Sequence, residues 1–454
     1  MQEAEALNGG LRSFPALRGS RNCDLLVIGG GFSGLMTACR AAQQGLRTIL
    51  VEARRLGSGA TAACMGMATA QLGEAYADAA RVSESAAASW ADVTQRTVAE
   101  LPSLLNKWGV HGGIRRQRSM LCCTDAADRE AFEALVALQQ RLRLPVGVTR
   151  DTGDCPVPVA YAAALDDQLI FDPLIMYTEL IEAAVRFHVS LYEHTLIHAV
   201  GTGGAVTDDG EITARHTVVA TGYPIHISAA EMMGILHQNV WIQRRYTGGF
   251  ACCHGYTLLH NSVRMASMPY GMAASACVGR PGLRGTEKRM LQAARMLDDQ
   301  LQDWSVLQEC AVQCVDAAGG IPLAGPISRE NPRVLVVGGL GVNGLTQSAI
   351  TSDVLLRQIT GQQLPESALF SPTGDFQRHA AWPVSRHQGR IRNAGTLLFG
   401  DAPRCPHMGC RMRWNSARQL WECPCHGSNF TSNGECRCAP ASENAQIPDH
   451  MRRK

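Results

Sequence analysis

The stretch CDLLVIGGGFSGLMTACRAAQQGLRTILVEA, residues 23–53, has the hydrophobic pattern of a strand, a helix and a second strand. Asp24–Ile28 is a short apolar run, residues 34–44 carry apolar side chains at helical spacing, and residues 46–51 form a second apolar run. Glycines follow the first run at once, and Gly45 stands where a helix is expected to stop. The stretch therefore predicts a βαβ unit.

The glycines Gly29, Gly31 and Gly34 of this unit have the spacing of a dinucleotide-binding loop. The first permits a tight turn, the second lets the backbone approach a pyrophosphate, and the third allows close packing of helix on strand. The helix N-terminus offers free N–H groups and a partial positive charge to that anion. Glu52, at the end of the second strand, can accept hydrogen bonds from the ribose hydroxyls, and its charge disfavours NADP. The alternative is a glycine turn with a structural role.

Four later stretches extend the pattern, and they are ARRLGSGATAACMGMATAQLG (53–73), FDPLIMYTELIEAAVRFHVSLYEHTLI (171–197), ARHTVVATGY (214–223) and GGIPLAGPISRENPRVLVVGGLGVNGLTQSAITSDVLLRQITG (319–361). In this order they resemble the D-amino-acid-oxidase-like superfamily of FAD-dependent oxidoreductases. The resemblance implies FAD as the dinucleotide. It also implies an α/β FAD-binding domain, Rossmann-like and of the glutathione-reductase type, with an interleaved α+β substrate domain.

The resemblance also implies which residues contact FAD. In the last stretch a strand leads through a glycine turn into a helix, whose N-terminus would donate hydrogen bonds to the negative N1–O2 edge of reduced flavin. The predicted cofactor-binding residues are Gly29, Gly31, Phe32, Ser33, Gly34, Glu52, Gly59, Thr61, Thr221, Gly222, Gly339, Gly341, Asn343 and Gly344.

A second chemical pattern lies at residues 404–430, RCPHMGCRMRWNSARQLWECPCHGSNF. Cys405 and His407 form one pair of candidate ligands, and Cys423 and His426 form another. Two thiolates and two imidazoles suit a Rieske 2Fe–2S centre. The alternatives are a structural zinc site, which usually pairs C-x-x-C knuckles, a c-type haem, which requires C-x-x-C-H, and chance clustering.

The segments CPCHGSNF and NGECRCAPA resemble the second ligand loop and a later loop of the Rieske family. This resemblance implies a 2Fe–2S cluster in which the thiolates bind one iron and the imidazoles the other. The implied metal ligands are Cys405, His407, Cys423 and His426. In the Rieske subclass with two further cysteines these form a disulfide, which implies a Cys410–Cys425 disulfide here. Cys436 and Cys438 are extra to the pattern.

The 454-residue chain is long enough for several domains. A net charge of +2 gives no strong cationic field for nucleic acid, and no apolar run reaches the roughly 18 residues of a membrane span. The N-terminus lacks a signal-peptide pattern, so we expect a cytoplasmic protein. The predicted domains are an N-terminal extension at 1–22, the FAD-dependent oxidoreductase domain at 23–361 with its substrate-binding part mainly at about 90–190 and 224–318, a linker at 362–385 and a small all-β Rieske domain at 386–454.

The pattern does not identify the catalytic residues. Residues 224–318 are short for the superfamily and their strands are poorly marked, although residues 286–304 predict an amphipathic helix. Candidates to bind a substrate carboxylate or deprotonate an amine are Arg244, Arg245, Tyr246, His254, His260 and Tyr270. Cys310 is a further candidate, for covalent attachment of the flavin.

FAD and a Rieske centre in one chain predict an oxidoreductase. We expect a small substrate, an amine or an amino acid, to be oxidised at the flavin, with electrons leaving singly through the 2Fe–2S cluster to an external redox carrier. Two alternatives stay open. In one the flow is reversed and the Rieske centre feeds a reductase, and in the other the chain is a non-catalytic redox sensor or electron-transfer module.

Overall fold

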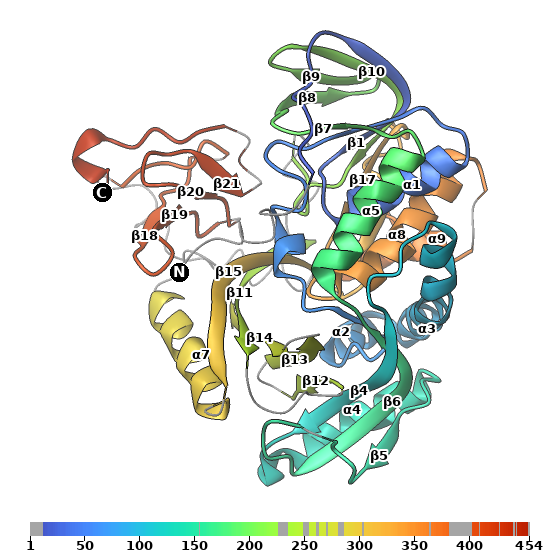
Figure 1. Ribbon diagram of the computed structural model, residues 1–454, viewed down its shortest axis with the longest axis vertical. Coiled ribbons are helices and arrows are strands. Elements are labelled where there is room, and N and C mark those ends of the chain that lie inside the picture. The colour runs from blue at the N-terminus through green and yellow to red at the C-terminus, as the bar shows by residue number, and fades with distance from the viewer. Residues whose placement is uncertain are drawn as a thin grey trace.

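Figure 1 shows the computed structural model, in which two large sheets with their helices lie beside a smaller C-terminal unit. The structure describes residues 12–153, 155–225, 235–247, 254–259, 263–268, 271–279, 286–301, 304–362, 365–380, 402–407, 409–425, 427–438, 441 and 443–452.

The βαβ unit begins an eight-stranded sheet, here called the nucleotide sheet, in the order β16–β17–β10–β1–β2–β7. β1 (Arg21–Ile28) pairs in parallel with β2 (Thr48–Val51) on one side and with β10 (Gly210–Val219) on the other. β17 (Val334–Gly338) continues the parallel pairing beyond β10. The remaining strands are β7 (Ser190–Tyr192), β8 (Ile197–Gly201), β9 (Gly204–Thr207) and β16 (Leu323–Pro326). Parallel pairing brings the carboxyl ends of β1, β10 and β17 to one edge.

The helices α1 (Phe32–Gln43), α5 (Pro173–Arg186) and α8 (Gly344–Ile359) pack together beside the nucleotide sheet (Figure 1). α1 begins two residues before the predicted start, because Gly31 is its N-cap. β2 begins two residues after the predicted start, because the Leu46 N–H still bonds to the Ala41 carbonyl at the end of α1. Among the described residues, no helix is both long and apolar enough to cross a bilayer.

The second sheet has nine strands in the order β15–β11–β14–β13–β12–β4–β6–β3, with β5 paired to β6. Its strands are β3 (Met67–Ala68), β4 (Arg115–Cys123), β5 (Gly147–Thr149), β6 (Tyr161–Ile170), β11 (Leu236–Thr247), β12 (Gly255–Leu258), β13 (Val263–Met268), β14 (Gly271–Gly279) and β15 (Ser305–Ala317). The accompanying helices are α2 (Glu74–Val82), α3 (Glu84–Lys107), α4 (Arg129–Arg141) and α7 (Thr286–Gln300), with the 3₁₀ turn η3 (Ala126–Asp128).

Residues 224–318 contain more strand than their sequence pattern indicates. β11, β14 and β15 have 12, 9 and 13 residues, and the predicted amphipathic helix is present as α7. β14 reads GMAASACVG, and alanine, glycine and serine have little intrinsic preference for a strand. Its pairing therefore depends on β11 and β13 on either side, which the local sequence does not reveal.

The C-terminal unit is a four-stranded antiparallel sheet. Its elements are β18 (Arg413–Asn415), β19 (Leu420–Glu422), β20 (Asn429–Phe430), β21 (Cys436–Cys438) and the 3₁₀ turn η4 (Asp449–Met451). Trp421 and Phe430 form its core together with Cys405 and Cys423, which places two of the predicted ligands in the interior. Residues 386–401, at the start of the predicted Rieske domain, lie outside the described residues.

Two segments outside the sheets are also packed. In the predicted N-terminal extension, Leu17 is buried and its N–H donates to the Thr195 hydroxyl at 3.0 Å. In the predicted linker, α9 (Ser367–Phe370) buries Phe370, and Gln377 donates a hydrogen bond to the Ile321 carbonyl at 3.1 Å. Both segments therefore pack against the part of the protein that contains the nucleotide sheet.

Candidate redox sites

The glycine turn between β1 and α1 is closely packed. Gly29 has φ of +111°, and a Cβ there would lie 2.4 Å from the Ala220 carbonyl oxygen. A Cβ on Gly34 would lie 1.9 Å from the Gly29 carbonyl oxygen, so only glycine allows α1 to approach β1 this closely. Gly31 is the N-cap residue of α1, and Ser33 lies in the buried first turn of this helix. This is the arrangement that an anion at a helix N-terminus requires.

Two side chains from the next loop support this turn. The Glu52 carboxylate accepts hydrogen bonds from Gly30 N at 2.8 Å and Arg54 N at 3.0 Å. The hydroxyl of Thr61, in the 3₁₀ turn η2 (Ala60–Ala63), accepts a hydrogen bond from Phe32 N at 3.1 Å. Because each carboxylate oxygen has two lone pairs, Glu52 can still accept from ribose hydroxyls.

The turn after β10 lies beside the turn after β17. Thr221 Oγ1 donates to the Tyr223 carbonyl at 2.7 Å, and Gly222 has φ of +80°. Gly339 has φ of +71°, and a Cβ on Gly338 would lie 3.2 Å from the Gly222 carbonyl oxygen. The structure thus brings the glycine turns after β1, β10 and β17 to the same edge of the nucleotide sheet. Gly59 is exposed in the loop before η2, with open space at its Cα.

The N-terminus of α8 faces the end of β15. Gly341 has φ of +55°, and a Cβ there would lie 2.6 Å from Asp316 Oδ1. Gly341 N donates to the Val315 carbonyl at 2.8 Å. Asn343 is the N-cap of α8, and Gly344 is its first residue, with open space at its Cα. The predicted flavin-contacting residues of the last stretch are therefore held against the second sheet.

A buried arginine beside α8 was not among the residues that the sequence pattern indicates. Arg264, on β13, is 6% exposed and donates to Asn343 Oδ1 at 2.7 Å. Burial lowers the pKa of Arg264 to about 10, and the charge of Asp316 acts in the opposite direction. Among the described residues none forms an ion pair with Arg264. Its sequence signal is one charged residue within VRMASM (263–268).

Arg264 belongs to a row of polar residues across four neighbouring strands. The row consists of Cys310, Gln243, Ser275 and Arg264, each opposite the next in the strand register. Cys310 Sγ donates to Gln243 Oε1 at 3.7 Å, and burial raises the pKa of Cys310 to about 11. Gln243 Nε2 is buried and has no hydrogen-bond partner in the part of the chain that the structure describes, and Ser275 contacts Met65 in the loop after η2. We call this row the polar row and the face that carries it the inner face.

The candidates from the sequence are distributed over both faces. Arg244 pairs with Asp298 on α7 and Glu309 on β15, which is a structural role. Arg245 lies near the polar row, since its charge acts on the Cys310 thiol. The remaining candidates are Tyr246, which is buried in the core beneath α7, His254, which packs against Tyr256, and His260 and Tyr270, which lie outside the described residues.

The two predicted ligand loops of the C-terminal unit bring four sulfur atoms together. The Sγ atoms of Cys410, Cys423 and Cys425 lie within 4.8 Å of one another, and Cys405 is hydrogen-bonded to Cys423. That hydrogen bond lowers the pKa of Cys405 to about 7. The same contacts raise the pKa of Cys423, because sulfurs this close cannot all ionise. A bound cation would stabilise several thiolates at once.

His407 follows Cys405 in the first loop, and burial lowers the pKa of its imidazole. The neutral imidazole is the form that binds a metal. His426, the other predicted histidine ligand, lies outside the described residues. The structure forms no disulfide between Cys410 and Cys425. Their sulfurs are close but not at the bonded separation of about 2 Å, and the pairing stays a prediction.

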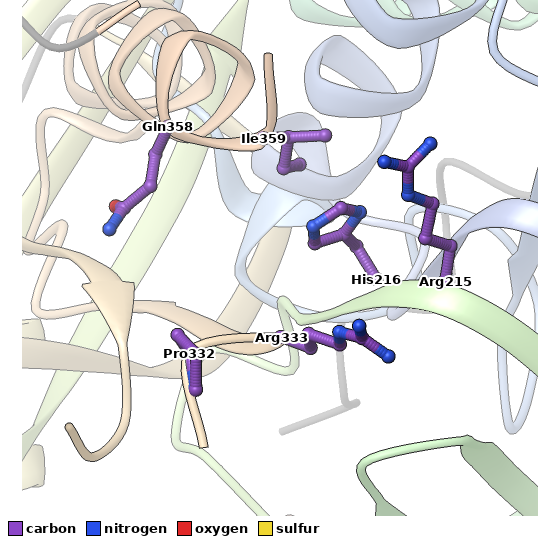
Figure 2. Close-up of a pocket in the computed structure, with 6 residues that line it drawn as sticks. All are labelled: Arg215, His216, Pro332, Arg333, Gln358 and Ile359. Atoms are coloured by element: carbon purple, nitrogen blue, oxygen red, sulfur yellow. The ribbon is translucent and has the colours of Figure 1, made fainter. Parts of the chain in front are cut away.

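A surface cavity of about 400 Å³ lies elsewhere on the nucleotide sheet (Figure 2). The lining residues are Arg215, His216, Pro332, Arg333, Gln358 and Ile359. Figure 2 shows the guanidinium groups of Arg215 and Arg333 pointing in different directions. The cavity lies where β17 begins, at the edge opposite to the glycine turns, so it is separate from the candidate nucleotide site.

Both sites fit the groups that the sequence predicts. The glycine turns leave the backbone open to a pyrophosphate. The inner face adds the Gln243 N–H₂ group, which has no hydrogen-bond partner among the described residues, and the buried cation of Arg264. The C-terminal unit offers clustered sulfurs with one stabilised thiolate, and a nearby neutral imidazole. These are the donors that a flavin nucleotide and an iron–sulfur cluster use.

Comparison with protein families assigns both parts of the chain. The family model described as FAD dependent oxidoreductase matches residues 24–358, and the model described as Rieske [2Fe-2S] domain matches residues 392–449. These matches confirm the predicted superfamily, the fold class and the enzyme class. They also confirm both cofactors, FAD for the larger part and a 2Fe–2S cluster for the C-terminal unit.

Individual proteins agree with this assignment. A protein of Bacillus subtilis (strain 168) described as the Rieske 2Fe-2S iron-sulfur protein YhfW is 23% identical over 485 residues, covering 95% of this chain and 94% of that protein. Glycine oxidase from Geobacillus kaustophilus superposes with a TM-score of 0.65 at 16% identity, covering 78% of this chain and 99% of that one. L-proline dehydrogenase from P. horikoshii gives a TM-score of 0.63 at 15% identity, covering 78% and 98%. The two structures show a shared fold.

Replacing Gly31 by valine should remove FAD and leave iron in place. A Cβ at Gly31 would lie 3.2 Å from Thr61 Oγ1, and a larger side chain would also enter the path of the pyrophosphate. We expect roughly tenfold weaker FAD binding or more, as for overpacking of a tight site. Flavin and iron content of the purified variant check this. Gly203→Ala is the matched control, since its Cα faces open space. Full flavin occupancy in Gly31→Val would contradict the assignment.

Replacing Cys405 by serine should abolish the cluster and spare the flavin, because a serine hydroxyl is not a soft thiolate ligand. Cys436→Ser is the control, since Cys436 is a neighbouring cysteine outside the predicted ligand set, with its thiol near the Ala441 carbonyl. We expect iron and inorganic sulfide to be lost in the first variant and retained in the second. Equal iron content in both would show that Cys405 is not a ligand.

Proposed function

The chain belongs to the FAD dependent oxidoreductase family and ends in a Rieske [2Fe-2S] domain, and on this premise we propose that it oxidises an α-amino acid or a related carboxylate-bearing amine. The electrons leave one at a time through the C-terminal domain to an external one-electron carrier. Bound FAD supplies the two-electron chemistry at the substrate, and a 2Fe–2S cluster supplies single-electron transfer.

The overall reaction balances with one chemical class of acceptor. A C–H bond and an N–H bond of the amine break and a C=N bond forms, which releases an electron pair and two protons. Two molecules of the one-electron carrier each take one electron, and the protons pass to solvent. Water then converts the imine to an oxo acid and ammonia.

Arg264 is the observation that carries this choice of substrate. It is a buried guanidinium without an ion-pair partner in the described part of the chain, and it lies at the positive N-terminus of α8. A buried cation that lacks an ion pair is costly, and the charge of Asp316 offsets only part of the effect of burial on Arg264, so the site favours a ligand with a negative group. A substrate carboxylate supplies that group, and a simple amine does not.

The neighbours of Arg264 support the same reading. Gln243, two strands away in the polar row, holds a buried N–H₂ group that has no hydrogen-bond partner among the described residues, and it adds a free donor to the inner face. The structural relatives are named for oxidation of glycine and of L-proline, both α-amino acids. The proposal extends that substrate class to this chain.

Anaerobic mixing of the protein with a panel of amino acids and their decarboxylated amines tests the proposal. We expect an amino acid to bleach the flavin absorption first and the cluster absorption afterwards. Arg264→Met should raise the concentration of amino acid needed for half-maximal bleaching by about 30-fold or more, the size expected when one partner of a buried charge pair is removed. The corresponding amine should be affected much less, because it has no carboxylate.

The other results have distinct meanings. Bleaching of the flavin without later cluster reduction would contradict electron exit through the C-terminal domain. Bleaching by amines and amino acids alike, with equal effects of Arg264→Met on both, would contradict the carboxylate assignment. A flavin that no substrate bleaches would favour a non-catalytic redox sensor.

The Cys410–Cys425 disulfide is part of this proposal. Cluster assembly would fix the two loops, and sulfurs already within 4.8 Å of each other need little further movement to bond. Forming the bond transfers two electrons and two protons from the thiols to an oxidant such as dioxygen or a small-molecule disulfide. Once formed between fixed loops, the disulfide resists glutathione even in the cytoplasm, where the sequence predicts the protein to work. Mass mapping of alkylated native protein should find both residues unmodified before reduction and modified after it. Alkylation of both in the unreduced protein would contradict the disulfide.

A further inference from the structure

The C-terminal domain contacts the side of the β11–β15 pair opposite to the polar row. Strand residues alternate between faces, so Gln313 points away from the face that carries Cys310. Gln238, opposite Val315 in the register, lies on the same side as Gln313. We call this the outer face. Figure 1 shows the C-terminal strands beside β15 and β11 at this side.

We propose that Gln313 is a positioning residue that holds the cluster-binding loop of the C-terminal domain on the outer face, so that electrons cross between the two redox sites through the single layer of β15. This rests on the proposed function, because it supplies the internal route which that function requires. It assigns the outer face as a docking surface and this chain's own Rieske domain as its occupant.

All polar atoms of the Gln313 side chain are engaged. Its Nε2 group donates to Gln238 Oε1 on β11 and to the Gly427 carbonyl at 2.8 Å. Its Oε1 accepts from Asn429 Nδ2 and from Arg418 Nη1, the latter at 3.3 Å. Three of these four partners belong to the C-terminal domain, and the fourth, Gln238, lies on β11 of the second sheet. A half-buried amide bonded on both sides is fixed in orientation, and so is the loop that it holds.

A second set of contacts fixes the other end of the docked domain. The end of β18 and the turn after it reach α7. Asn415 Nδ2 lies 3.4 Å from the Met290 sulfur, and Ser416 donates to Glu287. Within the domain, the ion pair between Arg418 and Glu422 is almost fully buried, with an N–O distance of 2.6 Å. Arg418 therefore presents a rigid guanidinium to the outer face.

The contacts form a continuous series of bonds from one site to the other. On the inner side, Gly341 N at the start of the α8 turn donates to the Val315 carbonyl at 2.8 Å. Two residues earlier on the same strand, Gln313 donates to the Gly427 carbonyl at 2.8 Å. Gly427 N in turn donates to the carbonyl of the ligand Cys423 at 3.0 Å. The predicted flavin side and the cluster loop are thus joined through three hydrogen bonds and a short length of β15.

The electron balance of this route is simple. One electron crosses from the inner to the outer side of β15 for each cluster reduction, and the carrier outside removes it before the second crosses. Each substrate therefore requires two passages, and no bond in the chain is made or broken. The two protons released from the substrate pass to solvent and do not cross β15.

The test uses anaerobic holoprotein in which a light flash reduces the flavin with EDTA as electron donor, so that no substrate is needed. The first-order rise of cluster reduction is recorded, together with amide hydrogen exchange in residues 427–430. Gln313→Leu removes every hydrogen bond of the side chain. We expect internal transfer to slow and amide exchange to quicken, each by roughly tenfold, with flavin and iron content unchanged.

Two further variants make the test specific. Gln313→Glu keeps the side-chain volume and the bonds from Asn429 and Arg418 but cannot donate to Gly427, so it should slow transfer as Gln313→Leu does. Gln292→Leu, at an exposed position of α7, should behave as wild type. If both Gln313 variants transfer electrons from flavin to cluster as fast as wild type does, the docking role is overturned and the proposed function is not. No internal transfer in wild type would instead contradict the proposed function.

Discussion

The alternation of side chains along β15 is the constraint on which both redox sites depend. Residues of one parity lie on the inner face, where Cys310 bonds to Gln243 and Asp316 lies against Gly341 in the turn before α8. A residue of the other parity, Gln313, faces the C-terminal domain. Because a one-residue slip would exchange the two faces, the register of β15 with β11 determines the position of both sites together.

Both sites also hold charged or ionisable groups that have no full ion pair within the described part of the chain. Arg264 is buried beside a positive helix end without an ion-pair partner among the described residues. In the C-terminal domain, the stabilised thiolate of Cys405 lies among other sulfurs that cannot ionise with it. The first imbalance favours an anionic ligand and the second a cation. Buried groups with shifted pKa values are typical of functional sites. Here the cation of Arg264 matches the proposed substrate carboxylate, and the thiols match the iron of the cluster that the Rieske family binds.

The sequence predicted those features whose geometry is local. The glycine turn before α1 and the paired cysteines and histidines are encoded by residue type and short spacing, so FAD and the 2Fe–2S cluster could be inferred. Arg264 and Gln313 were not predicted, because their roles depend on strand register. Arg264 reaches Asn343 from a strand 79 residues away, and Gln313 reaches Gly427 across 114 residues. β14 was missed for a related reason, since its small residues acquire strand structure from their neighbours.

Diffraction from holoprotein crystals at the iron and zinc absorption edges tests the central claim most directly, namely that two redox centres occupy opposite sides of one β layer. The account predicts flavin density between the glycine turns and the inner face. It also predicts an anomalous iron signal next to Cys405 and Cys423, with the Gly427 carbonyl still bonded to Gln313. A zinc signal at the cysteines, or iron in a C-terminal domain detached from β15, would contradict it.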